Sequence, residues 1–180
     1  MRLSRLIAGF FLVAALAAPA AAQTEGDLEN MLYLDLKDGR VVIKLRPDLA
    51  PNHVARIKEL VRQKYYDGHV FHRVIANFMA QTGDPTGTGT GGSGKRLKAE
   101  FSNAPFDRGT LGMARSQSPD SADSQFFICF KRADWLDGQY TVWGEVVDGM
   151  DFVDKIAKGE PPAKPDKIVS VRVAADAEKK

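Results

Sequence analysis

The feature that most constrains the fold is a pair of alternating apolar runs that meet at a two-residue turn. In "MLYLDLKDGRVVIKL", residues 31–45, leucines occupy every second position before Asp38-Gly39, and Val41, Ile43 and Leu45 do the same after it. A period of two places the apolar side chains of a strand on one face. An Asp-Gly pair tolerates the positive φ angles of a tight hairpin turn. This segment therefore predicts an antiparallel β-hairpin.

A helix is predicted after the hairpin. Pro51 suits the first helical turn, and Asn52 lies close to the expected N-cap. Apolar residues then recur at helical spacing, which predicts one buried face made of Val54, Ile57, Leu60 and Val61. Asp67-Gly68 ends the segment.

The rest of the chain consists mainly of short apolar runs broken by Gly, Pro and Asp. Strands are predicted in "HVFHRVI", "FMAQ", "GTLGMA", "SQFFICF", "YTVWGEVV" and "DKIVSVRVAA", with a second, short helix in "GMDFVDKIAKG". Short connections favour antiparallel pairing, and closure of a sheet removes its exposed edges. We therefore predict a closed, mainly β barrel with two helices.

The first 22 residues have the composition of a cleaved secretory signal peptide. Arg2 and Arg5 precede the apolar run "LIAGFFLVAALAA", and Ala20 and Ala22 are the small residues of the expected cleavage site. A transmembrane anchor is disfavoured because a span needs about 20 apolar residues. We predict an exported, periplasmic protein without stable membrane insertion. Residues 23–30 are expected to be a flexible lead-in and residues 176–180 a frayed tail.

Charge and cysteine content argue against several classes of protein. The chain has 25 Lys and Arg against 23 Asp and Glu, and loss of Arg2 and Arg5 lowers the first number to 23, so the mature charge is zero. A nucleic-acid-binding protein would show a clustered basic face, so no nucleic acid is expected as a partner. Cys129 is the only cysteine. An internal disulfide is thereby excluded, and its setting in "FFICF" favours a buried hydrophobe over a reactive thiol.

The stretch "GTGGSGKR", residues 89–96, nearly matches a phosphate-binding loop, with Gly89, Gly94 and Lys95 at the required spacing. However, Arg96 stands where Ser or Thr would reach Mg²⁺, and the following "RLKAEFSNAPF" is a poor helix. We therefore expect no nucleotide and interpret the stretch as a glycine loop at a functional edge.

Metal and nucleophile sites are not predicted. His69 and His72 are three residues apart, so in a strand they would point to opposite faces. The glycines around Ser93 do not form a nucleophile elbow, because lysine follows Gly94. We expect neither a metal nor a cofactor.

Two other segments combine polar and apolar residues. If the strands on either side of Ala76-Asn77 pair, Arg73, Met79 and Gln81 come together. On composition alone, a surface arginine beside core residues is the simpler interpretation. In "SQFFICF", alternation gives two largely apolar faces, one with Phe127 and one with Phe126. One face could belong to a core and the other to a pocket, or the strand could be buried on both sides.

Three separated segments resemble the cyclophilins, the cyclosporin-binding family of peptidyl-prolyl cis-trans isomerases. They are "FHRVIANFMAQTGDPTGTGTGGSG", "GTLGMARSQSPDSADSQFFICF" and "WLDGQYTVWGEVVDGMDFVDKI". The resemblance covers residues 31–175 and implies an eight-stranded antiparallel β-barrel closed by two α-helices. It also implies rotation about Xaa-Pro bonds (EC 5.2.1.8) without a cofactor. With the leader, it indicates the bacterial exported type, which would assist the folding of exported proteins. The implied partners are proline-containing peptides, unfolded exported proteins and cyclosporin, and we expect a monomer.

The resemblance assigns site residues position by position. Arg73, which matches the catalytic arginine, and Gln81 are assigned to catalysis, and Trp135 matches the tryptophan associated with cyclosporin sensitivity. The other positions assigned to substrate binding are Phe78, Met79, Met113, Ala114, Arg115, Gln125, Phe127, Leu136 and Tyr140.

Some positions depart from the family pattern. Arg115 stands where asparagine is frequent, Tyr140 where histidine is frequent, and Thr82 where glycine is frequent. Ala76-Asn77 replaces the usual Pro-Gly. Arg115 and Tyr140 bear on peptide preference and on cyclosporin affinity, whereas Arg73 is retained for catalysis.

Three hypotheses about function remain at this point. In an exported proline isomerase, Arg73 would bond the proline nitrogen of the twisted peptide more strongly than that of the planar one. A proline-peptide-binding module without catalysis would not need such a donor. A nucleotide-binding protein would be stabilised by nucleotide, and we expect no such effect.

Overall fold

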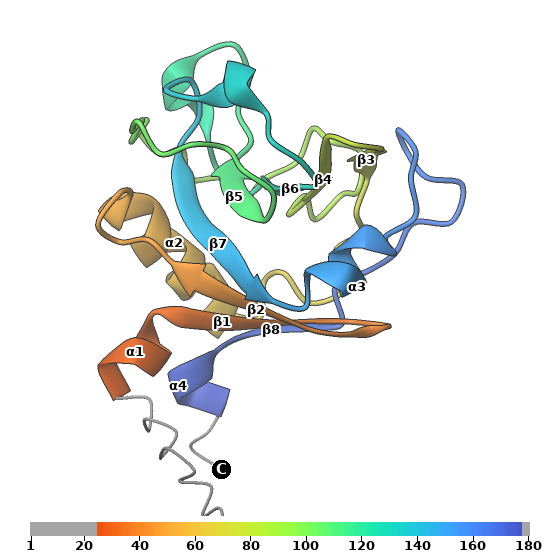
Figure 1. Cartoon of the computed structure of the whole chain (residues 1–180), viewed down its shortest axis with the longest axis horizontal. Helices are drawn as coiled ribbons and strands as arrows, with labels where there is room; N and C mark the ends of the chain where they lie inside the picture. Colours follow the sequence, from red (N-terminus) through yellow and green to blue (C-terminus); the bar gives the residue numbers. More distant parts are fainter. Residues whose placement is uncertain (1–24, 178–180) are drawn as a thin grey trace, which may run out of the picture.

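The computed structural model describes residues 25–177, and its centre is one curled antiparallel sheet. The eight strands lie in the order β3-β4-β6-β5-β7-β2-β1-β8, and the long strand β7 bends between the two halves of the sheet (Figure 1). The strands are β1 Met31–Leu36, β2 Gly39–Leu45, β3 Arg73–Ile75, β4 Met79–Thr82, β5 Thr110–Met113, β6 Phe126–Cys129, β7 Val142–Asp148 and β8 Ser170–Val173.

The predicted hairpin is confirmed. Strands β1 and β2 pair from Met31↔Lys44 to Leu36↔Gly39, so the turn falls at Lys37-Asp38 and the first residue of β2 is Gly39. Alternate side chains of both strands are buried, as the period of two requires.

The predicted closed barrel is wrong, because the sheet is open between β3 and β8. In the described part of the chain, no ladder joins these two edge strands. Connecting segments bridge them instead through single contacts, Val70↔Lys167 and Val74↔Gly159. Gly159 uses the backbone groups of Val74 in β3, and in β8 the backbone N of Val171 donates to Asp67 Oδ1 at 3.0 Å, so both edges have partners without strand closure.

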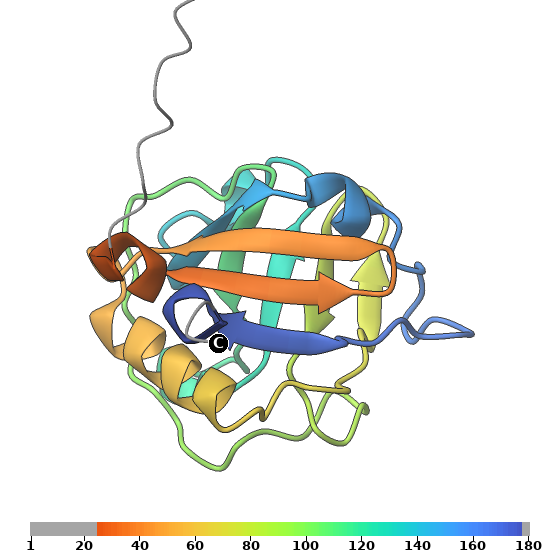
Figure 2. The same ribbon diagram turned by 90° about the horizontal axis from the view of Figure 1, so that it is seen from below.

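Within residues 25–177, four α-helices accompany the sheet: α1 Glu25–Glu29, α2 Pro51–Arg62, α3 Met150–Asp154 and α4 Ala174–Ala177. Two short 3₁₀ helices cover Pro119–Ser121 and Asp134–Leu136. Helix α2 packs against β8 and lies to the lower left of the β1, β2 and β8 strands in Figure 2. Its predicted apolar face is confirmed, since Val54, Ile57, Leu60 and Val61 are buried.

The start of α2 agrees with the prediction. Pro51 is the first helical residue and the N-cap is Ala50, two residues before Asn52, with no hydrogen bond from a capping side chain. The free N–H groups of a helix N-terminus need acceptors. Glu100 supplies them, accepting from the backbone N of Asn52 at 3.1 Å and of His53 at 2.9 Å.

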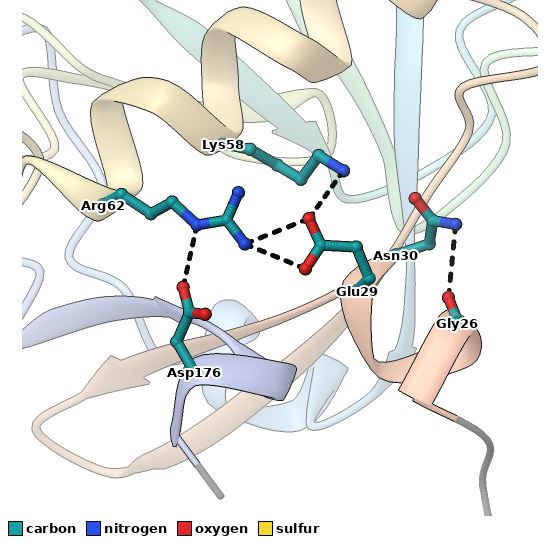
Figure 3. Close-up of polar contacts among 6 residues, drawn as sticks. All are labelled: Gly26, Glu29, Asn30, Lys58, Arg62 and Asp176. Atoms are coloured by element: carbon teal, nitrogen blue, oxygen red, sulfur yellow. Dashed lines mark hydrogen bonds and ion pairs between the residues drawn. The ribbon is translucent and has the colours of Figure 1, made fainter. Parts of the chain in front are cut away.

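Both ends of the described chain are more ordered than predicted. Part of the expected lead-in forms α1, and Asp176 and Ala177 of the expected tail belong to α4. The helices are tied to α2 by ion pairs of Arg62 with Glu29 and Asp176, and Lys58 adds a contact with Glu29 (Figure 3). The predicted signal peptide, residues 1–22, lies outside the described residues. Within residues 25–177, none of the helices combines the length and the apolar character needed to cross a membrane.

The apolar side chains form two clusters on opposite sides of the central strands. The larger cluster fills the space between α2 and the sheet, with Phe126 and Ile128 contributed by β6. The smaller cluster contains Met79, Phe106, Phe127 and Leu136. Strands β4, β5 and β6 are therefore covered on both faces, and the smaller cluster forms the base of the site described next.

Candidate active site

The hairpin of β3 and β4 brings the predicted polar and apolar residues together. Arg73 pairs with Gln81 and Ile75 with Met79, so the strands on either side of Ala76-Asn77 do pair, which the sequence offered as one of two possibilities. The turn uses Asn77 at a φ of 62°, a left-handed conformation that asparagine tolerates better than most residues. Strand β3 is shorter than the predicted run "HVFHRVI", because it begins only at Arg73.

Strand β6 separates core from cleft by simple alternation. Phe126 and Ile128 lie in the larger cluster, whereas Phe127 and Cys129 lie in the smaller one. The pocket interpretation of this strand is therefore correct for Phe127, which lines the cleft. Cys129 is fully buried, and burial raises the pKa of its thiol to about 12, so it is a packing residue as predicted.

A cleft of about 500 Å³ opens over the smaller cluster. Its lining includes every predicted site residue except Met113 and Gln125: Arg73, Phe78, Met79, Gln81, Ala114, Arg115, Phe127, Trp135, Leu136 and Tyr140. Gln139, which was not predicted, also lines it. Met79, Phe127 and Leu136 are almost fully buried, so the cleft has an apolar floor. Trp135 is 61% exposed at the rim, with its ring centroid 5.4 Å from that of Phe78.

The assignment of Met113 to the site is not supported by its position. Its side chain is buried in the larger cluster, because alternation along β5 turns it away from the cleft. Gln125 lies beside the cleft and lines a second cavity of about 370 Å³. Gln81, Ala114 and Arg115 line both cavities, so the two form one continuous groove.

A chain of polar side chains runs along this groove from Arg73. Arg73 Nη1 donates to Gln81 Oε1 at 3.4 Å, and Gln81 Nε2 donates to Gln125 Oε1 at 2.9 Å. Gln125 Nε2 in turn donates to the carbonyl oxygens of Gly89 and Gly91 at 3.0 and 2.8 Å. The orientation of both glutamine amides is therefore set by the backbone of the glycine loop.

The glycine loop, residues 89–94, is held by two carboxylates that sequence reasoning missed. Asp84 accepts from the backbone N of Gly89 and Gly91, and Asp123 accepts from that of Ser93 and Gly94. These amides are the groups that a phosphate-binding loop would offer to its ligand. The chain's own carboxylates bind these amides, so the amides are not available to a phosphate. The loop instead lines the second cavity.

Asp84 is an ionised group in a nearly closed setting, with 1% of the residue exposed. Burial alone would raise the pKa of its carboxyl. Hydrogen bonds from the side chain and backbone of Thr86 and from the amides of Gly91 and Gly89 outweigh this and lower the pKa to about 2. Asp84 is therefore a permanently charged acceptor at neutral pH.

Arg115, one of the departures from the family pattern, is a rigid part of the groove. Its guanidinium lies 4.5 Å from the Tyr140 ring centroid and 5.7 Å from that of Phe101. It also donates to the carbonyl oxygens of Ser116, Gln117 and Gln139 at 2.9 to 3.2 Å. With these partners, Arg115 is held in place where the two cavities meet.

One further residue contacts Arg73 and was not predicted. Glu160, in the segment after α3, accepts from Arg73 Nε at 2.8 Å. The sequence "KGEPPAKP" around it indicates only a loop, so no local signal connects it to β3. A metal site is a separate question. In the described range 25–177, no three His, Cys, Asp or Glu side chains are grouped to hold a metal ion.

Comparison with known proteins agrees with this arrangement. Residues 31–173 match the family described as cyclophilin type peptidyl-prolyl cis-trans isomerase/CLD. A probable peptidyl-prolyl cis-trans isomerase of Brucella suis biovar 1 (strain 1330) is 52% identical over an alignment of 190 positions, gaps included, which covers 96% of each chain.

Solved structures share the fold. Cyclophilin AquaCyp293 from Hirschia baltica superposes with a TM-score of 0.79 at 29% identity, over 86% of this chain and 77% of that one. A Cryptosporidium parvum cyclophilin type peptidyl-prolyl cis-trans isomerase, crystallised in the presence of the dipeptide Ala-Pro, superposes with a TM-score of 0.74 at 28% identity. That match covers 79% of this chain and 98% of the other.

The curled eight-stranded sheet and its groove are thus those of a rotamase, an enzyme of peptide-bond rotation. The chain belongs to the cyclophilin-type peptidyl-prolyl cis-trans isomerases (EC 5.2.1.8).

Proposed function

We propose that this isomerase works on proline-containing segments of exported proteins, with Arg73 as the catalytic group of the cleft. The observation that carries the proposal is the position of Arg73 at the rim of an apolar-floored cleft, beside Gln81. Arginine has five N–H donors. In the described residues, its hydrogen bonds use only Nε and Nη1, so donors remain for a peptide.

The reaction needs no covalent intermediate. An Xaa-Pro bond rotates through a state without amide resonance, over a barrier of roughly 18–20 kcal/mol for a peptide bond. In the twisted state, the proline nitrogen regains a lone pair that accepts a hydrogen bond from Arg73. The planar ground state accepts this bond less well, so Arg73 binds the transition state preferentially.

One hydrogen bond does not supply the whole acceleration. A 10⁵-fold effect, taken as a round figure, corresponds to about 7 kcal/mol, whereas a charged hydrogen bond contributes roughly 1.5–3 kcal/mol. The rest is assigned to positioning. The proline ring would sit on Met79, Phe127 and Leu136, and the flanking peptide would lie along the groove past Gln81 and Ala114. The crystallisation of the Cryptosporidium parvum relative with Ala-Pro supports a proline-containing ligand for this class of cleft.

The proposed location rests on the first 22 residues. Their basic start, apolar run and small residues are typical of a signal peptide. An exported isomerase would meet chains that are still unfolded, in which Xaa-Pro bonds isomerise slowly enough to limit folding. Assistance to the folding of exported proteins is therefore the role we propose.

Cyclosporin is proposed as a second ligand of the same groove. Trp135 is exposed at the rim and its ring contacts that of Phe78, so its indole is available to an apolar macrocycle. The fixed guanidinium of Arg115 and the Tyr140 ring beside it would adjust the affinity. Inhibition of the isomerase by cyclosporin in the wild type, and weaker inhibition after Trp135→Ala, is the expected result.

The decisive test of the site is the isomerase rate of Arg73→Ala on an Xaa-Pro peptide. Loss of a charged hydrogen bond predicts a fall in kcat/KM of roughly 10- to 150-fold. Arg46→Ala is the matched control, because Arg46 is also an ion-paired arginine but bonds Asp48 outside the groove. Wild-type kcat/KM in a folded Arg73→Ala protein would remove Arg73 from the mechanism.

A further inference from the structure

The segment that follows α3 lies against β3, the strand that carries Arg73. Strand β3 is an outermost strand of the sheet, and Gly159 forms a bridge to it. Val74 N donates to Gly159 O, and Gly159 N donates to Val74 O, both at 2.8 Å. Figures 1 and 2 show this blue segment running beside the outer edge of the sheet at β3. The bridge places the next residue, Glu160, beside Arg73.

This segment has anchors that do not involve Arg73. Lys158 Nζ donates to the carbonyl oxygens of Asp154 and Ile156 at 2.6 and 2.7 Å, and Ala157 N donates to Asp166 Oδ2 at 2.8 Å. At Gly159, a Cβ atom would lie 2.5 Å from Pro162 Cα, so the backbone passes too closely for a side chain. The carboxylate of Glu160 is therefore delivered by a loop that is shaped independently of the ion pair.

The two contacts of Arg73 differ in quality. Arg73 Nε meets Glu160 Oε2 at 2.8 Å, a normal distance for a charged hydrogen bond. Arg73 Nη1 meets Gln81 Oε1 at 3.4 Å, which is long. A planar guanidinium held only by the long contact could rotate about its side-chain bonds. Glu160 is thus the stronger of the two restraints.

The Glu160 contact leaves the proposed chemistry accessible. It uses Nε, so both N–H groups of Nη2 and the second N–H of Nη1 stay available to a peptide. Because the side chains of Arg73 and Glu160 are 43% and 52% exposed, the ion pair adds little to the stability of the fold. What the ion pair does is restrain the direction in which the Arg73 guanidinium points.

We propose that Glu160 is a positioning residue that holds the guanidinium of Arg73 in its productive orientation over the cleft. The proposal rests on the catalytic role proposed for Arg73. A preorganised donor avoids reorientation at the moment of rotation, so Glu160 contributes to kcat through Arg73. The peptide itself binds on the apolar floor and the glutamines, so KM depends little on Glu160.

The test is steady-state kinetics of Glu160→Ala and Glu160→Gln on an Xaa-Pro peptide. We expect kcat to fall about tenfold in Glu160→Ala, because small misplacements of a catalytic group are costly. KM should stay within about twofold, as expected for an interaction that matters in the transition state. Glu160→Gln keeps an acceptor oxygen and should recover most of the rate. Glu145→Ala, an exposed glutamate on β7 that faces Lys44, is the control and should match the wild type.

The double variant separates this proposal from the proposal about Arg73. If Glu160 acts through Arg73, Glu160→Ala changes nothing further in the Arg73→Ala protein. Wild-type kcat in Glu160→Ala, or an equal loss in the Arg73→Ala background, would overturn the positioning role and leave Arg73 in place. Wild-type activity in Arg73→Ala would instead overturn both assignments. Thermal unfolding of each variant checks that the fold is kept.

Discussion

At position 112, the floor of the cleft depends on the absence of a side chain. Gly112 lies in β5, and a Cβ atom there would be 2.4 Å from Phe127 Cζ and 2.6 Å from Phe106 Cε1. The two rings stack with their centroids 5.8 Å apart. Glycine therefore allows Phe127 to lie flat beneath the place proposed for the proline ring.

Gly112→Ala should push Phe127 into the cleft. We expect KM for an Xaa-Pro peptide to rise several-fold and stability to fall by about 1–3 kcal/mol, the usual range for overpacking. Steady-state kinetics and denaturant unfolding measure the two effects. Gly144→Ala is the control, since its Cβ would meet Ile43 at 3.2 Å away from the groove. Gly144→Ala should alter stability but not KM. An unchanged KM in Gly112→Ala would contradict the proposed binding of the proline ring above Phe127.

At the level of the elements, the glycine loop depends on Asp84. Its carboxylate bonds Thr86, Gly89 and Gly91, and these bonds lower the pKa of the carboxyl from 3.8 to about 2 despite burial. A lowered pKa in the folded state means that the stabilisation is complete above 3.8 and is lost as the pH falls through about 2. The size of the shift corresponds to about 2 kcal/mol.

Asp84→Asn tests this loop. At pH 7 the variant should be less stable by about 2 kcal/mol, because an amide accepts fewer hydrogen bonds than a carboxylate. The difference from the wild type should shrink as the pH falls from 3.8 toward 2, where Asp84 itself becomes protonated. Denaturant unfolding over this pH range measures it, with Asp38→Asn in the exposed hairpin turn as the control. A difference that does not change with pH would show that the charge of Asp84 is unimportant.

The same loop shows which elements could be predicted from the sequence. The hairpin of residues 31–45 and the apolar face of α2 follow from local periodicity and were predicted correctly, although the turn lies one residue earlier than Asp38-Gly39. Glu100 at the start of α2 and Asp123 on the glycine loop bond backbone about 30 to 50 residues away. Such contacts leave no periodic signal along the chain, so the sequence did not indicate them.

In the site, too, residues in local motifs were predicted and residues brought in by long-range contacts were not. The cleft residues were found because they fall within motifs that resemble a family, and most of them line one groove. Met113 was included through its neighbour in the motif, although alternation turns its side chain into the core. Glu160 was missed, because only the three-dimensional passage of its loop beside β3 brings it to Arg73.

For the whole molecule, the main difference from the prediction is the open sheet. Closure depends on whether β3 and β8 meet, and local sequence does not encode the distance between two edges. Here the segments around Val70, Gly159 and Lys167 span the gap. The open edge has a functional consequence in our proposal, since the segment that covers β3 is the one that carries Glu160 to Arg73.

Arg62 connects both ends of the described chain to α2. Arg62 Nη2 donates to Glu29 Oε2 at 2.8 Å, and Nε donates to Asp176 Oδ2 at 2.9 Å (Figure 3). The three side chains are between 37% and 45% exposed, so salt screens these pairs. Such pairs contribute at most about 1 kcal/mol each.

Arg62→Ala should therefore loosen α1 and α4 without disturbing the groove. We expect global stability to fall by about 1 kcal/mol at low salt and by less at high salt, because the lost pairs are exposed. Backbone amides of residues 25–30 and 174–177 should exchange hydrogen faster, since local opening no longer breaks an ion pair. Arg40→Ala, which removes an exposed pair with Asp35 in the β1–β2 hairpin, is the control and should leave these amides unchanged. Isomerase activity should be equal in all three proteins. Unchanged exchange at both helices in Arg62→Ala would mean that their apolar contacts alone hold the ends of the chain.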